Sequence, residues 1–66
     1  MEIREVLAQN LKAARQAKGL SQEELAHHID RTYISSLERC VYSASIDVVD
    51  RLAEVLEIEA SVLLKR

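Results

Sequence analysis

The segment KGLSQEELAHHIDRTYISSLER determines the fold. It spans residues 18–39 and contains the start signals of two short helices. Ser21 can cap a helix, and Glu24 three residues later completes a capping box. Asp30 is the next residue able to cap, and apolar residues follow it at helical spacing. These signals predict two short helices joined by a tight turn near the middle of the chain.

Amphipathic helices are predicted on both sides of this pair. The inward face of the first, about residues 2–18, comprises Ile3, Val6, Leu7, Leu11 and Ala14. Gly19 suits the left-handed position that ends a helix. Ser45 is expected to cap a fourth helix, whose inward face comprises Ile46, Val49, Leu52, Ala53 and Leu56. A short fifth helix is predicted near residues 60–64. The predicted fold class is therefore all-α, with five short helices in a single domain spanning residues 1–66.

A chain of 66 residues encloses a small core, which usually needs a disulfide, a metal or a second subunit. Cys40 is the only cysteine, so no internal disulfide can form. His27 and His28 are adjacent and would point about 100° apart on a helix, so no metal site is expected. No cofactor is expected either. Dimerisation remains, and three consecutive apolar residues at 62–64 predict that at least one is exposed in a monomer.

Composition narrows the function classes. The chain has 48% hydrophobic and 30% charged residues, and no apolar run approaches the roughly 20 residues of a membrane span. The lone cysteine and the absence of a signal-peptide pattern predict a cytoplasmic location. No catalytic spacing or glycine-rich phosphate loop is present, which argues against an enzyme. The net charge of −2 does not by itself indicate nucleic acid, although cations slightly exceed acids in the middle of the chain.

Residues 18–26 and 33–39 together closely resemble the helix-turn-helix family of the lambda and 434 phage repressors and Cro, also called XRE-type. The resemblance covers about residues 6–64. Residues 30–35, with Glu38 and Arg39, are similar to its branch of restriction–modification controller proteins. The resemblance to this family implies a transcriptional regulator that binds double-stranded DNA at a palindromic operator as a homodimer. The alternative is a protein-interaction or antitoxin-like dimerisation module whose DNA binding is weak or lost.

The resemblance also implies a DNA-binding site. Its residues are expected to be Gln22, Arg31, Thr32, Tyr33, Ser35, Ser36, Arg39 and Tyr42. Arg31, Thr32 and Ser36 are the expected base readers, because guanidinium and hydroxyl groups can bond base edges in the major groove. The expected phosphate contacts are Gln22, Tyr33, Arg39 and Tyr42. Arg15 and Glu38 match positions of an internal salt bridge. The competing interpretations are that Arg31 is only solvated, Tyr33 belongs partly to the core and Cys40 is a packed thiol.

Two departures from the family pattern affect these expectations. Glu57 stands where relatives often have a helix-ending glycine. The connection between Ala26 and Tyr33 is two residues shorter than usual and lacks the turn glycine. Either the second helix ends early and Asp30 still caps the third, with Ile29 filling the turn, or the two helices fuse. A fused helix could not fold back on its own subunit and would give a domain-swapped dimer.

Overall fold

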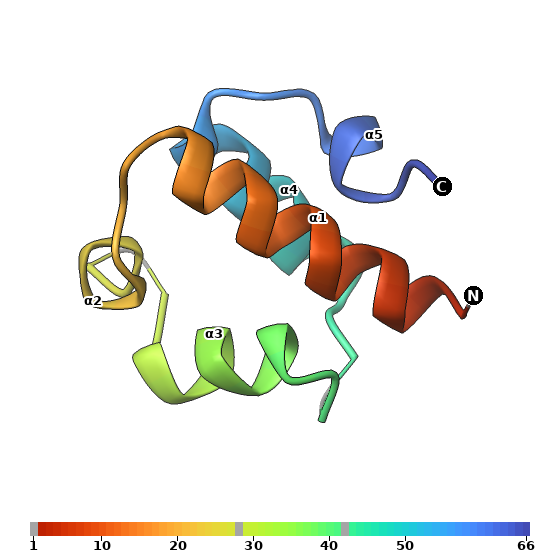
Figure 1. The fold of residues 1–66 in the computed structure, drawn as a ribbon, viewed down its shortest axis with the longest axis horizontal. Helices are drawn as coiled ribbons and strands as arrows, with labels where there is room; N and C mark the ends of the chain where they lie inside the picture. The colour runs from red at the N-terminus through yellow and green to blue at the C-terminus, as the bar shows by residue number, and fades with distance from the viewer. Residues whose placement is uncertain (1, 28, 42) are drawn as a thin grey trace.

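The structure, a computed structural model, describes residues 2–27, 29–41 and 43–66. Within these residues there is no strand, and the five helices are α1 (Ile3–Ala17), α2 (Gln22–Leu25), α3 (Arg31–Glu38), α4 (Ile46–Leu56) and α5 (Ala60–Leu63). In Figure 1, α1 crosses the front of the molecule with α4 behind it, and α2 and α3 lie along one side. The predicted all-α, five-helix fold class is confirmed. No helix of the described residues is long and apolar enough to cross a bilayer.

Three predicted N-caps form as the sequence indicates. The Glu24 backbone N–H donates to Ser21 Oγ at 3.0 Å, and the Ser21 backbone N–H donates to Glu24 Oε1 at 2.9 Å. The Asp30 carboxylate accepts from the Tyr33 backbone N–H at 3.2 Å, and the Ser45 hydroxyl caps α4 in the same way. These bonds satisfy N–H groups that have no partner within the helix, so they define where α2, α3 and α4 begin.

Three helix ends share one backbone geometry. Gly19, Cys40 and Glu57 all have left-handed backbones, with φ of 77°, 61° and 58°. The next residue in each case donates its N–H to a carbonyl five residues earlier, which is the Schellman pattern. Glycine adopts this conformation without steric cost, whereas a side chain at Cys40 or Glu57 meets the following carbonyl. Glu57 is also paired with the Lys18 ammonium group at the end of α1.

The core is formed mostly by leucines from all five helices. α1 packs against α3 and α5, α4 packs against α5, and α2 packs against α3. The largest fully buried side chains are Leu11, Leu25, Ile34, Leu37, Leu52 and Leu63. Two predicted inward residues are wrong: Ile3 is 44% exposed and Ile46 is 72% exposed. Each is the first residue of its helix, so it lies beyond the neighbouring elements that cover the rest of that face.

The shortened connection is accommodated locally. α2 ends at Leu25, and Ala26 forms its C-cap. Asp30 has φ of −51° and ψ of 130°, which is incompatible with a continuous helix. Ile29 packs against the core, as expected for the apolar turn position. The fused-helix interpretation, and the domain swap that depended on it, are therefore wrong. The bonding of His28 lies outside the described residues.

Candidate functional site

The outer face of α3 forms one wall of a polar surface groove. The residues that line it are Gln22, Arg31, Thr32, Ser35, Ser36 and Arg39. The opposite face of α3 buries Ile34 and Leu37 in the core. This amphipathic division holds one side of the helix on the domain and leaves the other side open to a ligand. Six of the eight residues predicted as a DNA site are therefore brought together in one groove.

The groove combines two cations with hydroxyl and amide groups. Arg31 and Arg39 are exposed at its two ends, and Ser35 and Ser36 are half-buried between them. No carboxylate is among the described residues that line it. Such a set can donate several hydrogen bonds to phosphates and to the polar edges of bases.

An ion pair beneath the groove fixes how α3 sits on α1. Arg15 Nε donates to Glu38 Oε2 at 2.7 Å, and Arg15 Nη2 donates to Glu38 Oε1 at 3.0 Å. Arg15 Nη1 donates to the Leu20 carbonyl at 2.9 Å. The Arg15 and Glu38 side chains are 11% and 4% exposed, and the hydrogen bonds to the carboxylate raise the pKa of Arg15. The predicted internal salt bridge is confirmed.

Gln22 belongs to both the groove and this buried network. Its side-chain amide donates to Glu38 Oε1 at 3.1 Å, an interaction that the sequence did not indicate. Glu38 thus accepts from residues of α1 and α2 while standing on α3. A carboxylate that accepts several hydrogen bonds is held in one position. Glu38 therefore connects α1, α2 and α3 beneath the groove.

The two tyrosines of the predicted site are placed differently. Tyr33 is half-buried against the core, and its hydroxyl donates to the Ser43 carbonyl at 3.4 Å. It is not among the residues that line the groove, which agrees with the partly-core interpretation. Tyr42 lies outside the described residues.

A salt bridge at the rim of the groove was not anticipated from the sequence. Arg31 Nη1 donates to Glu23 Oε1 at 3.4 Å, and the two side chains are 62% and 76% exposed. The residues are eight apart and belong to different helices. Helical periodicity gives no signal for such a pair, because the contact depends on how α2 and α3 cross.

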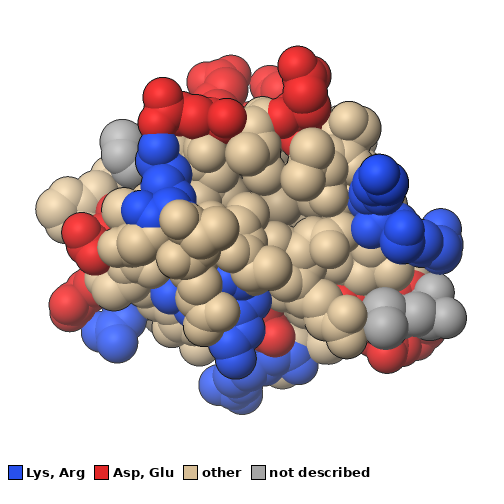
Figure 2. Space-filling view, turned by 45° about the horizontal axis from the view of Figure 1, so that its top comes forward, with Lys and Arg blue, Asp and Glu red and all other residues tan. Residues whose placement is uncertain are grey.

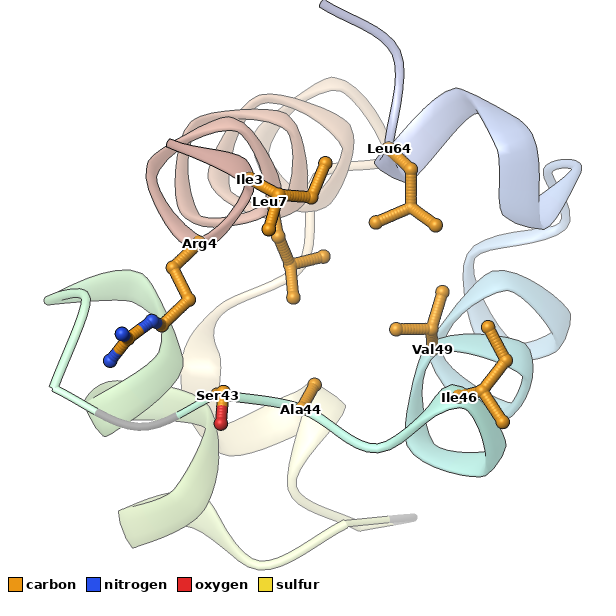
Figure 3. A pocket seen from close by; sticks show the side chains of 8 residues that line it. All are labelled: Ile3, Arg4, Leu7, Ser43, Ala44, Ile46, Val49 and Leu64. Carbon is orange, nitrogen blue, oxygen red and sulfur yellow. The ribbon is translucent and has the colours of Figure 1, made fainter. Parts of the chain in front are cut away.

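A second groove, at the amino-terminal ends of α1 and α4, is mainly apolar. Its lining comprises Ile3, Arg4, Leu7, Ser43, Ala44, Ile46, Val49 and Leu64. Figure 3 shows Leu7, Val49 and Leu64 directed toward one another across the groove, whereas Arg4 points away from it. The two isoleucines that periodicity wrongly placed in the core both line this groove. The two exposed isoleucines therefore lie on the same part of the surface.

Charged side chains of both signs are distributed unevenly over the surface. Figure 2 shows several acidic side chains along the upper edge and others at the left and lower right, with Lys and Arg side chains at the upper left, at the right and along the lower edge. The whole chain has a net charge of −2, so attraction of a polyanion would depend on local groups of cations such as Arg31 and Arg39 in the groove.

Comparison with known proteins gives consistent matches along the chain. A family model described as helix-turn-helix matches residues 11–63. A hypothetical transcription factor of Neisseria meningitidis serogroup B is 40% identical over 65 residues, covering 96% of this chain. This chain spans 61% of the length of that relative. Control protein C.SmaI of Serratia marcescens is 38% identical over 68 residues, covering 100% of this chain and 81% of the relative.

A solved structure extends the comparison to three dimensions. The restriction–modification controller protein C.Esp1396I, determined as a tetramer in complex with its operator, aligns with a TM-score of 0.86 at 31% identity. The alignment covers 96% of this chain and 86% of that protein.

Proposed function

Because this chain belongs to the helix-turn-helix family, we propose that it is a sequence-specific DNA-binding transcriptional regulator that acts as a homodimer on a palindromic operator. The observation that carries the proposal is the groove on the outer face of α3, where two arginines and three hydroxyl side chains meet. The solved relative C.Esp1396I is in complex with its operator, which supports the same class of ligand.

In the proposed complex the outer face of α3 enters the major groove. Arg31, in the first turn of α3, can bond a guanine edge, and Thr32 and Ser36 can bond neighbouring bases. We propose that Gln22 and Arg39, which line the same groove, contact phosphates, and that Ser35 faces the major groove beside the base readers. Arg31 and Gln22 already have partners, Glu23 and Glu38, so DNA would compete with those bonds or share them.

Tyr33 and Tyr42 are the less well supported members of the proposed site. The Tyr33 hydroxyl would have to leave the Ser43 carbonyl before it could donate to a phosphate oxygen. A packing role for its ring, with a phosphate contact made only after DNA binds, fits its half-buried position.

The proposed second subunit covers the apolar groove at the start of α1 and α4. Ile3 and Ile46 line it and are exposed, and Val62 of α5, which is not among the lining residues, is 46% exposed. Large apolar side chains grouped on a small domain are a typical subunit interface, and a two-fold dimer would present two copies of α3 to successive turns of DNA. The prediction that one of residues 62–64 is exposed is confirmed by Val62.

Selection of bound sequences from random duplexes tests this function. We expect a palindrome whose half-sites lie about 34 Å apart, one turn of the double helix. Affinity for the selected duplex should fall steeply between two salt concentrations, because phosphate contacts release counterions. Equal affinity for all duplexes, or binding insensitive to salt, would instead favour the protein-interaction module. A regulator of this kind acts where the genome lies, so we also propose the cytoplasm as its compartment.

A further inference from the structure

A carboxylate lies beside the expected base reader, across the shortened connection between α2 and α3. Five residues, 26–30, separate the two helices, and the first residue of α3 lies beside the second residue of α2. In this arrangement Arg31 Nη1 donates to Glu23 Oε1 at 3.4 Å. A cation in the first turn of a helix is disfavoured by the helix dipole, and the nearby carboxylate offsets this repulsion.

We propose that Glu23 is a positioning residue that sets DNA specificity by holding the guanidinium group of Arg31. The inference rests on the proposed function and adds to it a residue outside the groove lining. The contact uses Nη1 alone, and the described residues provide no other hydrogen-bond partner to this guanidinium. Nε and Nη2 therefore remain available as a pair of donors, the arrangement needed to bond both acceptors of a guanine.

The carboxylate also discriminates between bases and phosphates. An arginine side chain without an ion-pair partner pairs with any phosphate it reaches, which strengthens binding to all sequences equally. With Glu23 beside it, a phosphate that approaches Arg31 meets a negative charge as well as the cation. A guanine edge carries no net charge, so it can bond the free donors while the Arg31–Glu23 pair stays intact. The pair should therefore lower affinity for random DNA more than affinity for the operator.

Glu23→Gln tests the proposal in the full chain. The probes are the duplex selected from the random pool and a random duplex of equal length, with binding measured by fluorescence anisotropy at several salt concentrations. We expect the ratio of the two affinities to fall about fivefold, the lower end of the loss of one good base contact. Binding to random DNA should strengthen, and its salt slope should steepen by about one ion.

Two controls separate positioning from simple charge. Glu54→Gln removes the same charge from the exposed face of α4, outside the groove, and should leave the affinity ratio unchanged. In an Arg31→Ala background, Glu23→Gln should also leave the ratio unchanged, because the group it positions is gone. An equal fall in the ratio in that background, or with Glu54→Gln, would overturn the inference.

The outcome for the wild-type chain distinguishes the two proposals. If the wild type prefers one duplex and Glu23→Gln preserves that preference, only the proposed role of Glu23 is disproved. If the wild type has no preferred duplex, both the proposed function and this inference are disproved. Unfolding of each variant is followed by circular dichroism, and Glu23→Gln should fold normally because its side chain is 76% exposed.

Discussion

Arg31 is exposed on the outer face of α3, so its replacement should affect binding without disturbing the core. We expect Arg31→Ala to cost about 1–3 kcal/mol on the selected duplex and to relax the preference at one base in each half-site. Lys12→Ala removes an exposed cation from α1, away from the groove, and should change little. Equal losses on selected and random duplexes would reduce Arg31 to a phosphate contact.

Glu24 makes the stability of α2 depend on pH. The hydrogen bond from the Ser21 backbone N–H, aided by the Ser21 hydroxyl, lowers the pKa of Glu24 below its ordinary value. A lowered pKa stabilises the folded state above the unfolded pKa of about 4.3, and this stabilisation is lost as the pH falls through the folded value. The Lys18 ammonium group lowers the pKa of Glu57 and acts in the same direction.

Glu24→Gln is expected to flatten this pH dependence. Glutamine keeps an oxygen that can accept from Ser21 but carries no negative charge, so the variant should be less stable than the wild type near pH 7 and approach it at low pH. Because it has no proton to gain, it should lose less stability than the wild type between about pH 5 and pH 3. Urea unfolding at these pH values measures the difference. Parallel stability curves would show that the capping carboxylate does not contribute.

At the level of elements, the caps were the most informative part of the sequence. Ser21, Asp30 and Ser45 each begin a helix as predicted, because a cap acts on N–H groups within its own turn. Periodicity identified which face of α4 is buried but placed Ile46 inside, since it carries no information on where neighbouring helices end. The outcome at the short turn was open in the sequence, because two backbone paths satisfied the same apolar pattern.

The candidate site was predictable in part for the same reason. The groove residues on α3 share one helical face, so the sequence could group them once α3 was recognised. The contacts of Glu23 with Arg31 and of Gln22 with Glu38 join different helices and depend on their crossing geometry. No local pattern encodes that geometry.

Glu38 bonds to residues of two other helices, so its removal should lower the free energy of unfolding more than the removal of a surface residue does. Glu38→Ala leaves the Arg15 guanidinium buried without its carboxylate, and we expect the free energy of unfolding to fall by about 3 kcal/mol. Replacing both members, as Arg15→Met with Glu38→Leu, should be less damaging, because no unpaired charge remains buried. Chemical denaturation of the two proteins gives the comparison. A double variant less stable than Glu38→Ala would contradict this account of the pair.

For the whole molecule, the apolar groove should control association. Ile46→Asp and Leu64→Asp place a charge on its lining, and both should lower the dimer mass in sedimentation and the apparent affinity for DNA. Ile46 is 72% exposed, so the first variant should keep its fold. A wild-type chain that sediments as a monomer at high micromolar concentration would disprove the dimer.

Leu63→Asp provides the contrast for this experiment. The sequence pattern did not distinguish which of residues 62–64 is exposed, but Leu63 is fully buried in the core and Leu64 only partly buried. An aspartate at 63 should therefore unfold the domain, which circular dichroism would register at any concentration. Loss of dimer with retained helicity in this variant would contradict the assignment of Leu63 to the core.

The left-handed backbones at Cys40 and Glu57 have an evolutionary consequence. Each residue occupies a conformation that glycine adopts without steric cost, and each codon is a single nucleotide change away from a glycine codon. Lineages of this protein therefore hold two accessible mutations that could raise stability without altering the face of α3. Because changes of binding specificity are often destabilising, such mutations would let new operator preferences arise that the present chain could not tolerate.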